Sequence, residues 1–191
     1  MFIQTEETPN PATLKFLPGR TVLGNGSVDY RSIEEAAHSP LAQALFTIDG
    51  VTSVFLADDF LTVGKRDDKD WRVMKPVVLG AIMEHFTRGR PVVTDTTEVA
   101  GDAGVDAEDS EVVAKIKELL YTRVRPAVAQ DGGDIMFEAF DDGVVTLQMR
   151  GACAGCPSST ATLKMGIENM LRHYIPEVRE VRAAGLEYAP W

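Results

Sequence analysis

The sequence has few of the features that mark membrane-bound or secreted proteins. Its 191 residues include only two cysteines, and no apolar run approaches the roughly 20 residues of a membrane-spanning helix. The N-terminus is acidic, with neither the apolar core of a signal peptide nor the arginines of a transit peptide. We therefore expect an intracellular protein without a membrane partner, whose thiols stay reduced.

Basic charge is also scarce. The formal net charge is −10, which argues against nucleic acid as a main partner. Residues 98–111 hold six acids and no base. Residues 94–109 also show no helical or strand period, so we interpret them as a flexible acidic linker between domains at 1–93 and 110–191.

The N-terminal half predicts a mixture of strands and helices. Four segments carry the signals: a strand at 13–17, a helix opened by Ser39-Pro40, a hairpin of 51–57 and 60–65 around Asp58-Asp59, and a helix with apolar positions at 77, 78, 82, 85 and 86. Pro76 is expected near the start of the last helix and Gly89 at its end. No catalytic constellation is visible, and the isolated His38 and His85 are expected to be structural or on the surface.

The C-terminal half predicts the order α-β-β-α-β. Its signals are a helix capped by Ser110 and interrupted at Pro126, a hairpin of 135–140 and 144–149 around Asp141-Asp142-Gly143, a helix from Pro157 to Pro176, and a strand at 178–183. The fold class expected for the chain is therefore α+β, with two small two-layer domains joined by the linker.

Both cysteines, Cys153 and Cys156, lie in one loop of small residues between the hairpin and the helix that follows it. A Cys-x-x-Cys pair can bind zinc or an iron–sulfur cluster, or cycle between dithiol and disulfide. If Pro157 is the first helical residue, Cys156 is the N-cap. The helix N-terminus is then expected to favour both thiolates.

The number of ligands in one chain is too small for a closed metal site. Zinc or a cubane cluster usually takes four ligands, and this chain supplies two thiolates. His173 is separated from Cys156 by about four helical turns, on the order of 25 Å, so it cannot complete the same site. Two copies related by a two-fold axis would supply four sulfurs, which match a [4Fe–4S] cluster bridging a homodimer.

Other interpretations of Cys153 and Cys156 remain open. A dithiol–disulfide oxidoreductase also places such a pair at a helix N-terminus, and an intersubunit zinc site needs the same four ligands. Two ordinary core cysteines are disfavoured, because the surrounding glycine, alanine and serine residues give little apolar cover.

The residues around this loop resemble those of a known family. Asp131-Gly132-Gly133-Asp134 and the stretch from Gly151 to Ser159 resemble the C-terminal domain of NifU-like proteins, the Nfu family. Residues 5–16 and 71–76 are similar to the Nfu N-terminal domain. The resemblance implies a non-enzymatic carrier that receives a labile [4Fe–4S] cluster from upstream donors and passes it to apo iron–sulfur enzymes.

The resemblance also sets expectations for the parts that carry no recognisable chemistry. The N-terminal domain is interpreted as a recognition or docking module, and residues 131–134 as a turn into the first strand of the hairpin rather than a group in cluster chemistry. A bacterial cytoplasm is the expected location, or the mitochondrial matrix if the chain is a processed eukaryotic form.

Overall fold

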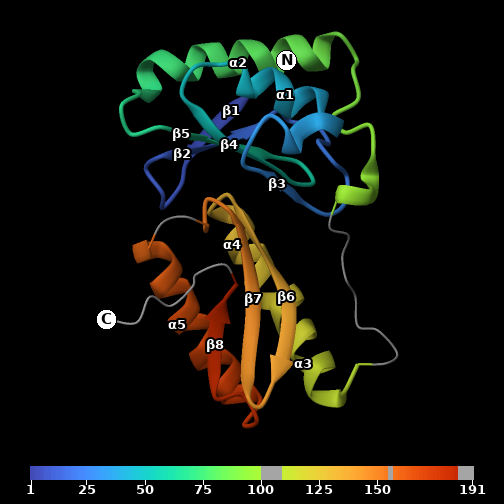
Figure 1. The fold of residues 1–191 in the computed structure, drawn as a ribbon, viewed down its shortest axis with the longest axis vertical. Coiled ribbons are helices and arrows are strands. Elements are labelled where there is room, and N and C mark those ends of the chain that lie inside the picture. The colour runs from blue at the N-terminus through green and yellow to red at the C-terminus, as the bar shows by residue number, and fades with distance from the viewer. Residues whose placement is uncertain (100–108, 155–156, 185–191) are drawn as a thin grey trace. The chain divides into compact units, whose positions relative to one another are not determined.

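The structure, a computed structural model, describes residues 1–99, 109–154 and 157–184. The chain divides into two compact units, Met1–Asp102 and Ala103–Trp191, and each has its own β-sheet and helices (Figure 1). The α+β class predicted from the sequence is confirmed. No helix in the described part of the chain has the length and apolar character needed to span a membrane.

The N-terminal unit is built on a five-stranded antiparallel sheet with the order β1-β2-β5-β4-β3. Its strands are β1 (Gln4–Glu7), β2 (Thr13–Leu17), β3 (Val28–Tyr30), β4 (Val51–Leu56) and β5 (Leu61–Lys65). The predicted strand β2 and hairpin β4–β5 are confirmed. The sequence analysis did not identify β1 or β3, the two edge strands.

The helices of this unit begin where side chains cap them. A short 3₁₀ helix, η1 (Glu35–His38), precedes α1 (Pro40–Phe46), and the Ser39 hydroxyl accepts a hydrogen bond from the Ala42 N–H at 3.2 Å, as predicted. The next helix, α2 (Trp71–Thr87), is capped by Asp70. Gly89, with φ 63°, follows the end of α2 as expected.

Two expectations for α2 were wrong. Pro76 lies inside the helix rather than near its start, because the Asp70 cap begins the helix five residues earlier. Val77 was placed on the apolar face but is 52% exposed. The side chains that α2 buries are Met74, Val78, Ile82 and His85.

Residues directly after α2 also differ from the predicted structureless linker. The Thr94 N–H donates to the His38 carbonyl at 2.7 Å, and the Thr94 hydroxyl donates to the same oxygen at 3.1 Å. A 3₁₀ turn, η2 (Thr96–Glu98), follows and is capped by Asp95. The central part of the predicted linker, residues 100–108, lies outside the described residues.

The C-terminal unit confirms the predicted order α-β-β-α-β. Its elements are α3 (Glu111–Leu119), a π-helical turn η3 (Leu120–Val124), α4 (Arg125–Gln130), β6 (Gly133–Asp141), β7 (Val144–Gly151), α5 (Pro157–Tyr174) and β8 (Glu180–Ala183). The sheet order is β6-β7-β8, with β6 antiparallel and β8 parallel to β7. The parallel pair is connected through α5, the kind of crossover that parallel strands require.

Local sequence signals explain the irregular points of this unit. The π-turn η3 ends at Val124, two residues before Pro126, which has no N–H to continue the α-helical pattern, so the predicted interruption is confirmed. Asp142 and Gly143 have φ of 45° and 78°, the two positive values of a type I′ hairpin turn.

The core of the unit lies on one face of the sheet. Along β7, Val145, Leu147 and Met149 are buried while Gln148 is exposed. Side chains of α3, α4 and α5 join the same apolar cluster, for example Ile116, Val128 and Leu171. The unit therefore has two layers, one of helices and one of strands.

Candidate metal centre

The connection from β7 to α5 carries the predicted metal ligands. Strand β7 ends at Gly151, whose φ is 65°, and α5 begins at Pro157 as the sequence predicts. Cys153 lies in this connection. Cys156 lies outside the described residues, so its predicted place at the N-cap of α5 stays a prediction.

Cys153 is a core residue in this conformation. Only 7% of its surface is exposed, and it belongs to the apolar cluster of the C-terminal unit. The Thr160 hydroxyl, also buried, donates to the Cys153 carbonyl at 2.9 Å and so ties the loop to the first turns of α5. The expectation that small neighbours leave this sulfur without apolar cover was wrong, because side chains distant in sequence provide the cover.

Gly133 lies directly beside the sulfur of Cys153. A Cβ atom on Gly133 would lie 2.5 Å from the Cys153 Sγ and 2.8 Å from the Arg150 carbonyl oxygen. The preceding Gly132 has φ 80°, and its carbonyl accepts a hydrogen bond from the Ala152 N–H at 3.2 Å. The paired glycines therefore provide the space that the thiol occupies.

The sequence analysis missed this contact. Gly133 and Gly151 are direct partners in the β6–β7 pairing, so the start of one strand lies beside the end of the other. Extending the predicted hairpin outward from its Asp142-Gly143 turn would bring the two glycine-containing stretches together. The strand register implied by this turn could therefore have predicted that Gly133 lies close to the cysteine loop.

The electrostatic environment of Cys153 opposes the thiolate in this conformation. Burial raises the pKa of Cys153 to about 12, and the carboxylates of Asp131 and Asp134 contribute further. This contradicts the expectation that the helix N-terminus would favour the thiolate. The sulfur points into the apolar core beside two acids, and these effects outweigh the helix dipole.

Asp134 is held by a buried ion pair. The Arg125 side chain donates twice to its carboxylate, at 2.8 and 3.0 Å, and the Ile135 N–H donates to the same group at 2.8 Å. The Arg125 guanidinium also lies over the Tyr121 ring, 4.9 Å from its centroid. These contacts fix the start of β6. They also fix the position of Gly132 and Gly133, which lie beside Cys153.

The described residues do not assemble a closed metal site around Cys153. No group of three or more histidine, cysteine, aspartate or glutamate side chains that could hold a metal occurs within 1–99, 109–154 or 157–184. His173 lies in the last turn of α5, about 24 Å of helix rise from Pro157, and its ring packs against Tyr174. Cys156, two residues from Cys153, therefore stays the predicted second ligand of this chain.

Comparison with known proteins assigns both halves of the chain. Residues 3–89 match the family described as "Scaffold protein Nfu/NifU N terminal", and residues 116–182 match the "NifU-like domain". The chain is 52% identical over 182 residues to the human "NFU1 iron-sulfur cluster scaffold homolog, mitochondrial", covering 95% of this chain and 71% of that protein. The chain belongs to the Nfu/NifU family.

The chain is also similar to other members of the Nfu/NifU family. The chain is 51% identical over 184 residues to "NifU-like protein 4, mitochondrial" of Arabidopsis thaliana, covering 95% of this chain and 65% of that protein. The chain thus spans about two thirds of the length of these relatives. A NifU-like protein of Saccharomyces cerevisiae, solved in solution, is 31% identical over 50% of this chain and 86% of its own, with a TM-score of 0.45.

Proposed function

We propose that this Nfu-family chain is an iron–sulfur cluster scaffold and carrier. A labile [4Fe–4S] cluster is its cargo, held between two subunits by Cys153 and Cys156 of each, and handed to apo iron–sulfur enzymes. The protein is a carrier rather than an enzyme. The observation that carries the proposal is the 52% identity, over 95% of this chain, to the human iron–sulfur cluster scaffold homolog.

The inventory of ligands supports a shared cluster. Each chain has two cysteines, and the described residues offer no other group of metal-binding side chains. A cubane cluster takes four thiolates, so two chains provide the full set. Homodimers with two-fold symmetry place such a site on the axis, where each subunit contributes the same two residues.

The packing of Cys153 supports loading that is coupled to a local change. Its Sγ lies against Gly133 inside the core, where iron has no access. Cargo binding therefore requires the side chain to turn outward, while the bond from Thr160 can keep the loop at the start of α5. Free N–H groups at that helix end can donate to cluster sulfides. Because each subunit encloses only half of the cluster, release is easy.

The alternative functions are less well supported. A dithiol oxidoreductase is distinguished by turnover in a disulfide-reduction assay, because the raised pKa of buried Cys153 opposes thiolate chemistry of either kind until the side chain turns outward. An intersubunit zinc site uses the same four sulfurs and is distinguished by metal analysis. Since the named relatives are mitochondrial, we propose the mitochondrial matrix as the location, or the cytoplasm for a bacterial source.

Anaerobic reconstitution of the full chain with iron and sulfide tests the proposal. We expect about four iron and four sulfide per dimer with brown absorbance, and loss of both in Cys153→Ala and in Cys156→Ala. His173→Ala is the matched control, because His173 is the remaining strong metal ligand of this unit and is expected to leave the content unchanged. A colourless dimer with one zinc, or turnover in a disulfide-reduction assay, would contradict the proposal.

For the N-terminal unit we propose a docking role toward donors or recipients of the cluster. This unit has no cysteine, and its histidines, His38 and His85, belong to the helical segments already described. Its possible contribution is therefore recognition rather than ligation.

A further inference from the structure

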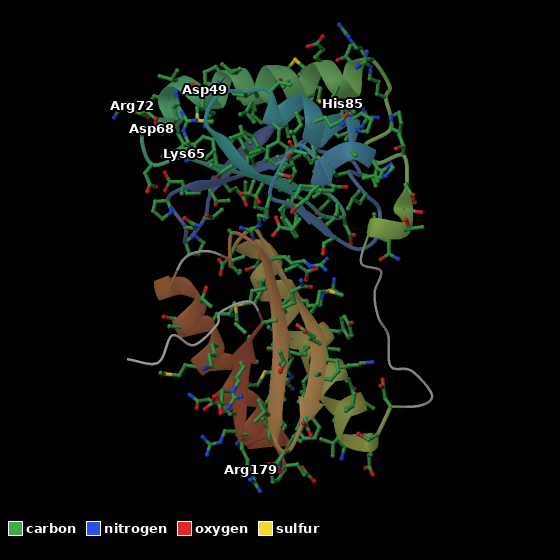
Figure 2. The ribbon with its side chains drawn as sticks, viewed as in Figure 1. Asp49, Lys65, Asp68, Arg72, His85 and Arg179 are labelled. Carbon is green, nitrogen blue, oxygen red and sulfur yellow. The ribbon has the colours of Figure 1, made fainter. Side chains whose placement is uncertain are left out.

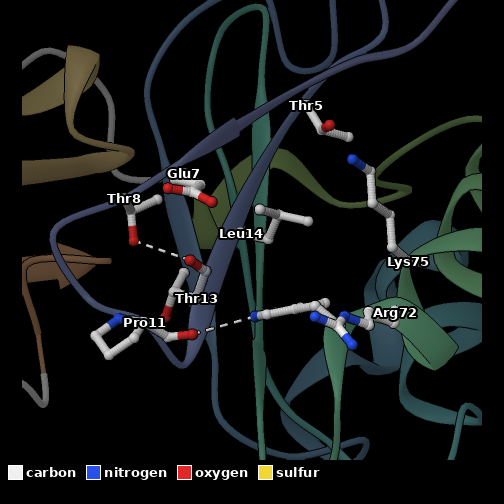
Figure 3. A pocket seen from close by; sticks show the side chains of 9 residues that line it. Thr5, Glu7, Thr8, Pro11, Thr13, Leu14, Arg72 and Lys75 are labelled. Atoms are coloured by element: carbon white, nitrogen blue, oxygen red, sulfur yellow. Dashed lines mark hydrogen bonds between the residues drawn. The ribbon is translucent and has the colours of Figure 1, made fainter.

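A cavity of about 510 Å³ opens where the β1–β2 hairpin meets the first turns of α2 (Figure 3). Thr5 and Glu7 line it from β1, and Trp71, Arg72 and Lys75 line it from α2. The two stretches that resemble the Nfu N-terminal domain, residues 5–16 and 71–76, therefore meet at this cavity. The proposed function of the cysteine loop uses neither of them.

Packing around Trp71 gives the cavity a fixed wall. The Trp71 ring meets the fully buried Phe16 edge-on, with centroids 6.4 Å apart, and its Nε1–H donates to the Pro11 carbonyl at 3.2 Å. Thr5 pairs with Phe16 across the two strands, so Thr5 lies just beyond the place where the helix covers the sheet. The start of α2 is thereby anchored while the face of β1 stays open.

The charges in the cavity favour an anion. Within the described residues, neither the Arg72 side chain nor Lys75 has an ion-pair partner. Arg72 projects from the end of α2 opposite to His85, and Lys75 extends from the helix toward Thr5 (Figures 2 and 3). Glu7 also lines the cavity, but the two cations exceed this one acid and make no ion pair with it, so they form a local site for a carboxylate.

The edge of the sheet beside the cavity is open. Strand β1 ends the five-stranded sheet, and it pairs with β2 alone among the described strands. Its outer N–H and C=O groups can therefore bond an added strand, the mode by which many domains bind extended peptides. A free edge next to a cationic cavity fits a protein segment better than a small metabolite.

We propose that an extended, acidic segment of a partner protein adds to the edge of β1 and places a carboxylate between Arg72 and Lys75. This inference rests on the docking role proposed for the N-terminal unit and identifies its surface. Glu7 sets the register, because an acid opposite it would be repelled. The carboxylate of the partner therefore sits at the Thr5 end of the strand.

A peptide titration of the full chain tests this surface. The probes are acetyl-Ser-Val-Glu-Val-Glu-Val-Ser-amide and its counterpart with glutamine in place of glutamate, followed by amide chemical shifts of the ¹⁵N-labelled protein. We expect the acidic peptide to bind at least tenfold more tightly, with shifts concentrated in residues 4–8 and 71–75. Glu7→Gln should tighten this binding further.

The charge variants decide the outcome. Arg72→Glu with Lys75→Glu should abolish the preference for the acidic peptide, and the milder Arg72→Gln with Lys75→Gln should reduce it. Arg88→Glu, a single charge reversal at the other end of α2, should leave it intact. Equal binding of both peptides, binding of neither, or a preference that survives the double reversal would overturn the proposal. Iron and sulfide content of the same variants reports separately on the carrier function.

Discussion

The described side chains that we propose to act in function are accessible in the N-terminal unit and buried in the C-terminal unit. In the N-terminal unit, Arg72 and Lys75 line an open cavity, without an ion pair among the described residues. In the C-terminal unit, Cys153 is buried in the core next to an ion pair of Arg125 and Asp134. The proposed docking surface is thus exposed in this structure, whereas the thiol is covered.

This difference has a consequence for stability. Cys153 packs with the core of a unit that has only three strands, so changes around the thiol should alter the stability of the whole C-terminal unit. Changes at the β1 edge should not, since those side chains carry little of the N-terminal core. Peptide-resolved amide hydrogen exchange on the full chain measures the two units separately.

Breaking the buried ion pair should have the largest effect. Arg125→Leu leaves the Asp134 carboxylate buried without its cation, which should lower the free energy of unfolding of the C-terminal unit by about 3 kcal/mol. Exchange protection of β6 and α4 should fall, while protection of β2 and α2 stays the same.

Arg182→Leu is the matched control for this variant. Arg182 pairs with Glu180 on the surface of the same unit, at 2.9 Å, and exposed pairs contribute little. Its exchange pattern should equal that of the unmodified chain. The prediction would be contradicted if Arg125→Leu and Arg182→Leu lost equal exchange protection. It would also be contradicted if the N-terminal unit lost protection.

Filling the space beside the thiol should have the next largest effect. In Gly133→Ala the new methyl group would overlap Cys153 Sγ and the Arg150 carbonyl, which should cost about 1–3 kcal/mol in the C-terminal unit. Urea unfolding with exchange as readout measures this loss. Gly166→Ala is the control: it lies in α5 with open space around it and should stabilise the helix slightly. An unchanged stability in Gly133→Ala would show that Gly133 does not confine the thiol.

The smallest effect concerns the pH dependence of the N-terminal unit. Burial lowers the pKa of His85, and its Nε2 is buried without a hydrogen-bond partner. The unfolded chain, with a histidine pKa of about 6.5, therefore binds the proton first. The stability of this unit should be fully present above pH 6.5 and fall as the pH drops toward the lower folded pKa.

His85→Gln should flatten that pH dependence. The measurement is exchange protection of α2 between pH 7.5 and 5, corrected for intrinsic exchange rates. His38 is the matched control because its side chain is exposed, and His38→Gln should retain the pH dependence of the unmodified chain. A protection of α2 that is independent of pH in the unmodified chain would contradict the assignment.

The elements with local signals were predictable from the sequence. Ser39-Pro40 and Asp142-Gly143 each specify their structure within a few residues, and both were confirmed. The strand β1 was missed because it is polar and short, and its formation depends on pairing with β2 rather than on an apolar pattern. Pro76 misled the prediction because proline is most common at the start of a helix, whereas Asp70 caps α2 and begins it five residues earlier.

The metal site was predictable only in part. The spacing of Cys153 and Cys156 predicts the ligands, but nothing local to the loop predicts the burial of one sulfur. The apolar cluster of the C-terminal unit provides that burial, and Gly133 provides the space for the sulfur. The raised pKa comes first from this burial and then from Asp131 and Asp134, about 20 residues earlier in the chain. Such contacts depend on strand register and core packing, which the sequence of the loop alone does not determine.

The central claim is that one cluster belongs to two chains. Native mass spectrometry of the anaerobically loaded full-length protein tests it most directly, because one mass reports subunits and cargo together. We expect a species of two chains with a single [4Fe–4S] cluster, which separates into two bare chains when the cluster is lost. A species of one chain carrying its own cluster would contradict the claim.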